Sequence, residues 1–458
     1  MGEPQRGEGR PELTRARRQR GLSQGAAAEA VGVGPTTWAR WERGEQGVRA
    51  AHRARIATAF GVDAVEVERW IEGWAVAATS SWPLADFGGG SLADTVKTAA
   101  QLWRYEMNPS RRHLLATLPF VPTALGEWLT AWSYGISDEL AIHHGSGPTV
   151  GLADVNRINE AVRAFRRMDD QVGAGVVRPV VMNYLNSSVS PLLQGRYDDK
   201  VGAELMSAAA GMTALAGWTA FDLNRHGQAQ HYLGQALRLA KLANDPLLGA
   251  WVLSALTRQA IYLEQSTWAV WLARAAVDTA RRAEAPPRVM ALMLVREAHA
   301  RALGVGPAQD RDTHKVKQVE RLLIETERAC AHGATDRDPG WASRFDEVEL
   351  RTQAGDCWSL LGEQRRALAC AEEGVKEFSQ RLPRSAQFCQ VNMAKAYLGM
   401  GELEQALDAA RTAIPMTKTL HSARSVERIR QFAGQLEPYG DSIMVREFHD
   451  HLNHALAA

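Results

Sequence analysis

Cysteine is scarce in this 458-residue chain, which has four: Cys330, Cys357, Cys370 and Cys389, with no Cys-x-x-Cys pair. All four fall in helix-like stretches, which favours reduced core thiols of a cytoplasmic protein over a disulfide framework. The uncharged run at residues 205–221, which no other run exceeds, is shorter than the roughly 20 residues of a membrane-spanning helix and is rich in small residues. The first ten residues lack the apolar core of a signal peptide. We therefore expect a cytoplasmic protein with no membrane partner.

Motifs that carry catalysis are also missing. The chain contains no Gly-x-x-x-x-Gly-Lys-Ser/Thr, His-Glu-x-x-His or Gly-x-Ser-x-Gly pattern. The three glycines at 88–90 lack the strand and helix of a dinucleotide site. The histidine pair at 143–144 stands in a loop, and His449, His451 and His454 are typical of a surface helix. We expect no enzyme activity, no cofactor and no metal site.

Positive charge is concentrated at the start of a chain whose net charge is only +1. Residues 1–60 hold eleven arginines, no lysine and six glutamates, so their balance is +5 and the remaining residues must carry −4. A basic head on a mildly acidic body is typical of attraction to a phosphate backbone. The four arginines within residues 15–20 either contact DNA or form a solvated face.

Two short helices joined by a tight turn are expected within this head. Ser23 is a good N-cap for the first helix, and residues 26–30 are strong helix formers. Gly32 can end that helix in the left-handed conformation that a reversal needs. Pro35 suits the first turn of the second helix, which Gly44 closes.

This pattern resembles the helix-turn-helix of Cro/repressor-type (Xre family) DNA-binding domains over residues 10–62. The matching residues are Gly21-Leu22-Ser23-Gln24, Val31-Gly32-Val33 and Trp38-Ala39-Arg40-Trp41-Glu42-Arg43-Gly44. In that family the second helix enters the DNA major groove with its N-terminal residues on base edges. The residues expected to contact DNA are therefore Gln24, Pro35, Thr36, Thr37, Ala39, Arg40 and Arg43.

The resemblance implies a role for several of these positions. Arg40 is the natural reader of guanine, and Thr36 can bond a base or a phosphate. The family's glutamine at Gln24 contacts phosphate. Pro35 departs from the polar residue common there, and Arg43 either holds a phosphate or is solvated.

The resemblance also implies how the head is held together. It predicts an ion pair between Arg17 and Glu42 that fixes the first helix to the end of the recognition helix. Trp38 and Trp41 lie three positions apart and share a face, so core packing is favoured over insertion between bases. A fifth helix over residues 63–77 either packs on this domain or forms a dimer contact.

The rest of the chain shows apolar residues at helical spacing and no convincing strand. An internal repeat is anchored on Ala229, Ala269, Ala367 and Ala406, at steps of 40, 98 and 39 residues. The long step indicates a hidden unit centred near residues 290–330. The repeat resembles tetratricopeptide (TPR) helical pairs, which stack into a superhelix with a concave surface.

The TPR resemblance implies which side chains line that surface. The copies at Ala229 and Ala269 lose the glycine that precedes the other two, and residues 192–197 are expected to form a first, worn repeat. Aromatic residues at helical spacing are often core, so a peptide-binding groove is a hypothesis here. Its expected residues are Trp218, Phe221, Trp251, Arg258, Tyr262, Thr352, Asp356, Phe388, Asn392 and Lys395.

The sequence as a whole predicts an all-α fold: a five-helix helix-turn-helix domain followed by a TPR-like α-solenoid. The expected segments are a DNA-binding domain at 1–77, a linker at 78–92, a helical region at 93–210 and TPR-like repeats at 211–458. The predicted function is a sequence-specific, dimeric transcription regulator that binds double-stranded DNA at a palindromic operator. The body would bind a peptide, small-molecule or protein effector; the alternative is a DNA-located scaffold that recruits a protein partner.

Overall fold

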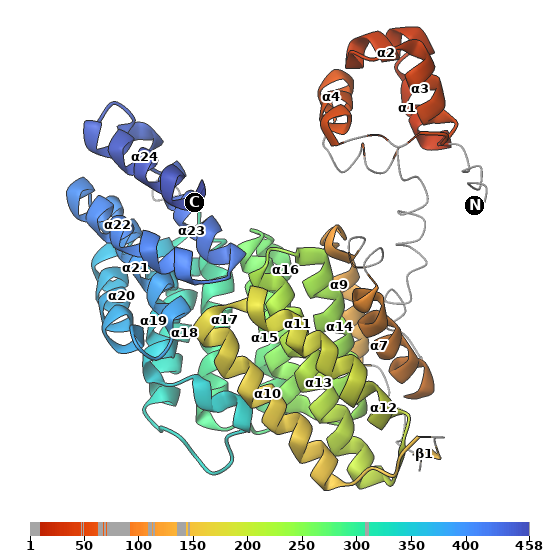
Figure 1. Ribbon diagram of the computed structural model, residues 1–458. Coiled ribbons are helices and arrows are strands. Elements are labelled where there is room, and N and C mark those ends of the chain that lie inside the picture. The colour runs from red at the N-terminus through yellow and green to blue at the C-terminus, as the bar shows by residue number, and fades with distance from the viewer. Residues whose placement is uncertain are drawn as a thin grey trace. The chain divides into compact units, whose positions relative to one another are not determined.

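The computed structural model describes residues 10–46, 48, 50–62, 67, 70, 92–108, 112, 115–134, 143–144, 147–306 and 311–457. The chain divides into two compact units, Met1–Ala85 and Asp86–Ala458 (Figure 1). Helices make up nearly all the regular structure of the described residues. The expected all-α fold, with a helix-turn-helix head and a repeat-like helical array, is confirmed.

The first unit contains helices α1 (Pro11–Gln19), α2 (Gln24–Val31), α3 (Pro35–Glu42) and α4 (Ala50–Phe60). The side chain of Ser23 accepts a hydrogen bond from the backbone N–H of Ala26, and so caps α2. Gly32 ends α2 with a φ of +71°, which a residue with a Cβ rarely adopts. Pro35 then opens α3. The local signals in the sequence thus set both ends of the turn.

Two tryptophans form the centre of this unit's core. Trp38 and Trp41 are buried, and the ring of Trp38 stacks on Phe60 at a centroid distance of 5.7 Å. Val67 and Trp70 are helical and buried in the same core. Trp70 therefore packs on this domain. The other residues of the expected fifth helix lie outside the described residues, as do residues 78–91 of the expected linker.

The second unit consists chiefly of helix pairs in chain order, each helix packed on the next (Figure 1). These helices are α13 (Asp199–Asp222), α14 (His226–Leu242), α15 (Pro246–Tyr262), α16 (Ser266–Arg282), α17 (Pro287–Ala302), α18 (Thr313–Cys330), α19 (Glu347–Leu360), α20 (Gln364–Phe378), α21 (Pro383–Gly399), α22 (Leu403–Thr419), α23 (Ala423–Gly434) and α24 (Ile443–Ala457). The pair α17 and α18 occupies the place of the hidden unit. The four anchor alanines all lie near the start of the second helix of a pair and are buried.

The turn inside each of these four pairs has the same backbone conformation. The residue five positions before the anchor alanine is Asn224, Glu264, Gly362 or Gly401, and each has a positive φ, between 56° and 82°. Two copies therefore lost the glycine but kept the left-handed turn. Asparagine tolerates this conformation, whereas glutamate adopts it at a cost that the packing of the pair must offset.

The segment before α13 departs from the repeat. It contains α7 (Leu92–Met107), α9 (Ala124–Tyr134), α10 (Leu152–Val172), α11 (Ala174–Tyr184), a π-helical turn η1 (Leu185–Val189) and α12 (Ser190–Leu193). Residues 192–197, expected to form a first, worn repeat, include the end of α12 and the two-residue strand β2 (Arg196–Tyr197), which pairs antiparallel with β1 (His143–His144). The expected boundary between residues 210 and 211 falls inside α13.

Helix α10 links distant parts of the array. It packs along α13, from the first pair, and also contacts α21, from a pair near the C-terminal end. Figure 1 shows it as the long yellow helix beside α13. The C-terminal end of α10 thereby brings Asp169 and Asp170 to Arg384 of α21.

Candidate functional site

The exposed edge of α3 carries the side chains that the sequence assigns to DNA contact. Pro35, Thr36 and Arg40 are exposed, while Thr37 and Ala39 are half-buried. The buried tryptophans lie on the opposite face of the same helix, so a short helix both fills the core and leaves one polar edge in solvent. This arrangement suits a helix that enters a groove.

Glu42, at the end of α3, bonds to three side chains that hold this helix in position. Its carboxylate accepts hydrogen bonds from Arg17 Nε at 2.6 Å, Gln24 Nε2 at 2.7 Å and Trp38 Nε1 at 2.9 Å. Burial would raise the pKa of Glu42, but these hydrogen bonds hold it below its ordinary value. The expected Arg17–Glu42 pair is confirmed, and it joins α1, α2 and α3.

Two of the expected phosphate contacts already have partners in the protein. One amide N–H of Gln24 is engaged with Glu42, so a phosphate contact would use the other. The exposed Arg43 pairs with Glu45, Nε to Oε1 at 2.8 Å, and this hydrogen bond raises the pKa of Arg43. The exposed pair can open at little free-energy cost, because surface ion pairs are weak.

The residues predicted for the groove line two neighbouring cavities on the inner side of the array. A small cavity of about 50 Å³ is lined by Trp218, Trp251 and Arg258. A larger one of about 520 Å³ is lined by Phe221, Arg258, Tyr262, Asp356, Asn392 and Lys395. Phe388 lines both, whereas Thr352 lines neither. Helical spacing thus brings together side chains from α13, α15, α19 and α21.

Asn392 is tied into the wall of the larger cavity. Its Nδ2 donates to Asp356 Oδ1 at 2.9 Å, and its Oδ1 accepts from Arg428 Nη2 at 2.5 Å. Lys395, one turn further along α21, forms no hydrogen bond or ion pair among the described residues. Burial, followed by the nearby Arg428, lowers the pKa of Lys395 to about 8.

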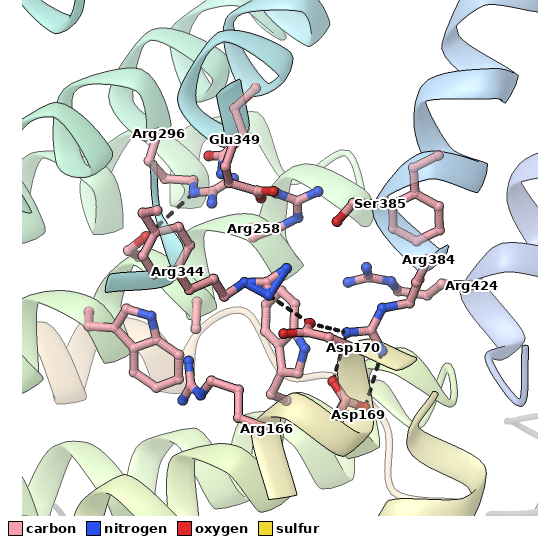
Figure 2. Close-up of a pocket in the computed structure, with 17 residues that line it drawn as sticks. Arg166, Asp169, Asp170, Arg258, Arg296, Arg344, Glu349, Arg384, Ser385 and Arg424 are labelled. Atoms are coloured by element: carbon pink, nitrogen blue, oxygen red, sulfur yellow. Dashed lines mark hydrogen bonds and ion pairs between the residues drawn. The ribbon is translucent and has the colours of Figure 1, made fainter. Parts of the chain in front are cut away.

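A network of buried ion pairs closes the wall of the smaller cavity (Figure 2). Arg384 contacts Asp169 through two hydrogen bonds, at 2.7 and 3.1 Å, and lies 3.2 Å from Asp222 Oδ2. Arg344 donates to Asp170 at 2.7 Å. Arg424 Nε lies 3.5 Å from Asp222 Oδ1. Sequence reasoning missed this network, whose individual pairs join residues up to 215 positions apart and follow no local pattern.

Basic side chains outnumber acidic ones around the two cavities, and Figure 2 shows guanidinium groups from several helices pointing toward the same space. The basic lining residues are Arg166, Arg258, Arg296, Arg344, Arg384, Lys395, Arg424 and Arg428. The acidic lining residues are Asp169, Asp170, Glu264, Glu349 and Asp356. Burial lowers the pKa of Arg166 to about 10, and those of Arg296 and Arg424 to about 9.

Comparison with known proteins adds a match for the first unit. A family model described as a helix-turn-helix domain matches residues 11–70. This range spans α1 to α4 and ends at Trp70, before the helical array begins. The chain is thus similar to helix-turn-helix proteins over its first unit, which indicates a DNA-binding regulator. No curated protein matches the chain.

The part of the chain that the structure describes contains no candidate for a membrane-spanning helix. None of the helices there combines the length and the apolar composition needed to cross a bilayer.

Proposed function

We propose that this chain is a sequence-specific, dimeric transcription regulator of the Cro/repressor (Xre) type, acting in the cytoplasm. The observation that carries the proposal is α3, which exposes Thr36 and Arg40 on one edge, buries two tryptophans on the opposite face, and is held by Glu42. In this proposal residues 1–77 form the DNA-binding domain and residues 78–92 connect it to the helical body.

DNA recognition follows from the chemistry of that edge. The arginine-rich head attracts the phosphate backbone without regard to sequence. Arg40 then reads guanine through a two-pronged hydrogen bond, and Thr36 adds a contact to a base or a phosphate. Pro35 has no N–H to donate, so it sets the start of the helix or touches a thymine methyl. Two copies would read half-sites about one helical turn apart, roughly 34 Å, on a palindromic operator.

The helical array is the effector-binding part in this proposal, and it is TPR-like. Its support is the repeated pair with a left-handed turn before a buried alanine, and the cavity of about 520 Å³ on its inner side. A peptide, small molecule or protein held there would change how the pairs stack. That change would alter the spacing of the two heads, and so operator affinity.

Selection of binding sites from random DNA tests this function. We expect a palindromic consensus for the full chain, and loss of sequence preference at one position of each half-site in Arg40→Ala. Arg321→Ala, which removes an exposed arginine from α18, is the matched control and should leave the consensus intact. Recovery of no consensus, or the same consensus for Arg40→Ala, would contradict the proposal.

A second candidate function is that of a scaffold: the head binds DNA and so fixes the location of the protein, and the body recruits a protein partner. It is favoured by an exposed aromatic patch on α9 and α16, where Tyr134 is 85% and Trp271 is 51% exposed beside an open hollow. Such large exposed aromatic side chains are typical of interaction surfaces. A stoichiometric partner that is lost in Trp271→Ser, with operator binding unchanged, would favour the scaffold.

A further inference from the structure

We propose that the larger inner cavity binds a small ligand with at least two anionic groups, phosphoryl or carboxyl, through Arg258, Lys395, Arg424 and Arg428. This specifies the effector class of the proposed function and rests on its claim that the array binds an effector.

The charge balance of the two cavities calls for such a ligand. Eight basic side chains line them, against five carboxylates. Asp222 does not line either cavity but pairs with Arg384 and Arg424, so it counts as a sixth carboxylate. The excess is therefore two positive charges. His299, also in the larger cavity, stays neutral at pH 7 because burial lowers its pKa to about 4. Unbalanced charge in a buried site is expensive unless a counter-charge binds there.

Several of the basic groups keep hydrogen-bond donors without a partner. Arg258 and Lys395 form no hydrogen bond or close ion pair with any residue that the structure describes. The Nη1 atoms of Arg296 and Arg424 and the Nε atom of Arg428 are buried and also have no hydrogen-bond partner there. Buried donors of this kind are rare in folded proteins, so they indicate a missing acceptor.

Aromatic rings hold two of these guanidinium groups in fixed orientations. The guanidinium carbon of Arg424 lies 4.3 Å from the ring centre of Phe221 and 5.1 Å from that of Phe388. That of Arg428 lies 4.8 Å from the ring centre of Phe388. A ring that covers the face of a guanidinium leaves its N–H edge available, and that edge matches the two oxygens of a carboxylate or phosphate. The site is therefore pre-organised for oxyanions.

The size and position of the cavity suit a small molecule. Its volume of about 520 Å³ falls within the roughly 300–1,000 Å³ usual for small-ligand sites. It reaches solvent beside the exposed side chains of Glu264 and Leu360, which gives a ligand a route of entry. Glu264 at this rim would disfavour an anion at the mouth, so the charged groups belong deeper, near Arg258 and Lys395.

Calorimetric titration of the full chain tests the proposal. The probes are inorganic pyrophosphate for the phosphoryl arm, citrate for the carboxyl arm, and acetate as the single-charge comparison, all at one ionic strength. We expect one saturable site per chain for pyrophosphate or citrate, with the preferred arm identifying the ligand's anionic groups. Affinity should fall at least tenfold in Lys395→Met and in Arg258→Gln, and should be unchanged in Lys376→Gln, whose lysine is exposed on α20.

Two results would overturn the proposal. One is that neither probe binds more tightly than acetate. The other is that Lys395→Met and Arg258→Gln bind like Lys376→Gln, which would put the anion elsewhere. Lys395→Met replaces a half-buried lysine with an apolar side chain of similar length, and circular dichroism checks that the variant is folded.

The same samples separate this inference from the proposed function. If no anion binds but Arg40→Ala still loses operator preference, the inference fails and DNA recognition stands. If pyrophosphate or citrate binds at the cavity while operator affinity is the same with and without it, the anion site stands and its effector role fails.

Discussion

Arg17 and Glu42 form a two-pronged ion pair, with Nε to Oε1 at 2.6 Å and Nη2 to Oε2 at 3.2 Å, and both are less than one-tenth exposed. The pair joins the first helix to the end of the recognition helix across 25 positions of sequence. Its geometry ties α3 to α1 through a single carboxylate.

Glu42→Ala should therefore destabilise the first unit by about 3 kcal/mol, because it leaves the Arg17 guanidinium buried without a counter-charge. Trp38 and Gln24 lose their acceptor in the same variant. Glu42→Gln keeps an oxygen acceptor and should lose less. Amide hydrogen exchange of residues 11–60 in the full chain measures the loss.

The matched control for this prediction is Glu45→Ala. Its exposed pair with Arg43 has the same chemistry in solvent, so its removal should not change exchange in α1 to α3. Equal protection in Glu42→Ala and Glu45→Ala would show that the buried pair does not hold the recognition helix.

Arg40 and Arg43 should differ in how they affect DNA binding. Arg40→Ala should cost about 1–3 kcal/mol on the selected operator and little on random DNA, because a base contact is lost. Arg43→Ala should weaken both equally and reduce the salt slope by about 1, because a phosphate contact is lost. Titrations at several salt concentrations, on both DNAs, separate the two outcomes. If Arg40→Ala loses the same affinity for the operator and for random DNA, then Arg40 contacts a phosphate and does not read a base.

Acid should destabilise the helical array through three histidines. Burial lowers the pKa of His226, His231 and His299 to about 4, from 6.5. Between pH 6.5 and pH 4 the unfolded chain binds protons that the folded chain does not, so the free energy of unfolding falls as the pH falls. Each histidine contributes up to about 1.4 kcal/mol per pH unit.

Urea unfolding of the array at pH 7, 6 and 5 measures this slope. His231→Gln should reduce the pH dependence of the free energy of unfolding by the contribution of one histidine. His451→Gln, which replaces an exposed histidine of α24, should not. A slope that is the same in all three proteins would mean that His231 is already solvated in the folded state.

The head could be predicted from sequence because its signals are local. Ser23, Gly32 and Pro35 act within a turn or two of their own positions, so the caps and the turn follow from residue type. The spacing of Trp38 and Trp41 likewise set the buried face. The repeat was detectable for a similar reason, since each alanine and the turn before it lie within one helix pair.

The wall of the inner cavities could be predicted only in part. The resemblance to TPR pairs gave the predicted groove residues from Trp218 to Lys395, because it places certain positions of each first helix on the concave surface. It gave no sign that α10, within the predicted helical region, reaches the cavity wall, where its Asp169 contacts Arg384. Pairings over such sequence distances depend on the curvature of the superhelix, which no local pattern encodes. The contact of these residues with a ligand stays a prediction.

The buried charge of Lys395 lowers the stability of the fold, although the same charge would favour the binding of an anion. Burial, with Arg428 beside it, lowers its pKa to about 8 from 10.5, and Asp356 opposes this only in part. Between pH 8 and pH 10.5 the unfolded chain keeps a proton that the folded chain releases. The free energy of unfolding should therefore rise with pH across that window.

Lys395→Met should remove this dependence and stabilise the array at pH 7 by an amount on the order of 2 kcal/mol, since the charge no longer has to be buried. Urea unfolding at pH 7 and pH 10 measures both effects, with Lys376→Met on the exposed face of α20 as the control. A lysine that lowers stability when the cavity is empty needs a reason to be there, and a bound anion supplies one. If Lys395→Met is less stable than the parent chain at pH 7, the lysine already has its counter-charge within the protein, and the case for an anionic ligand loses one of its main supports.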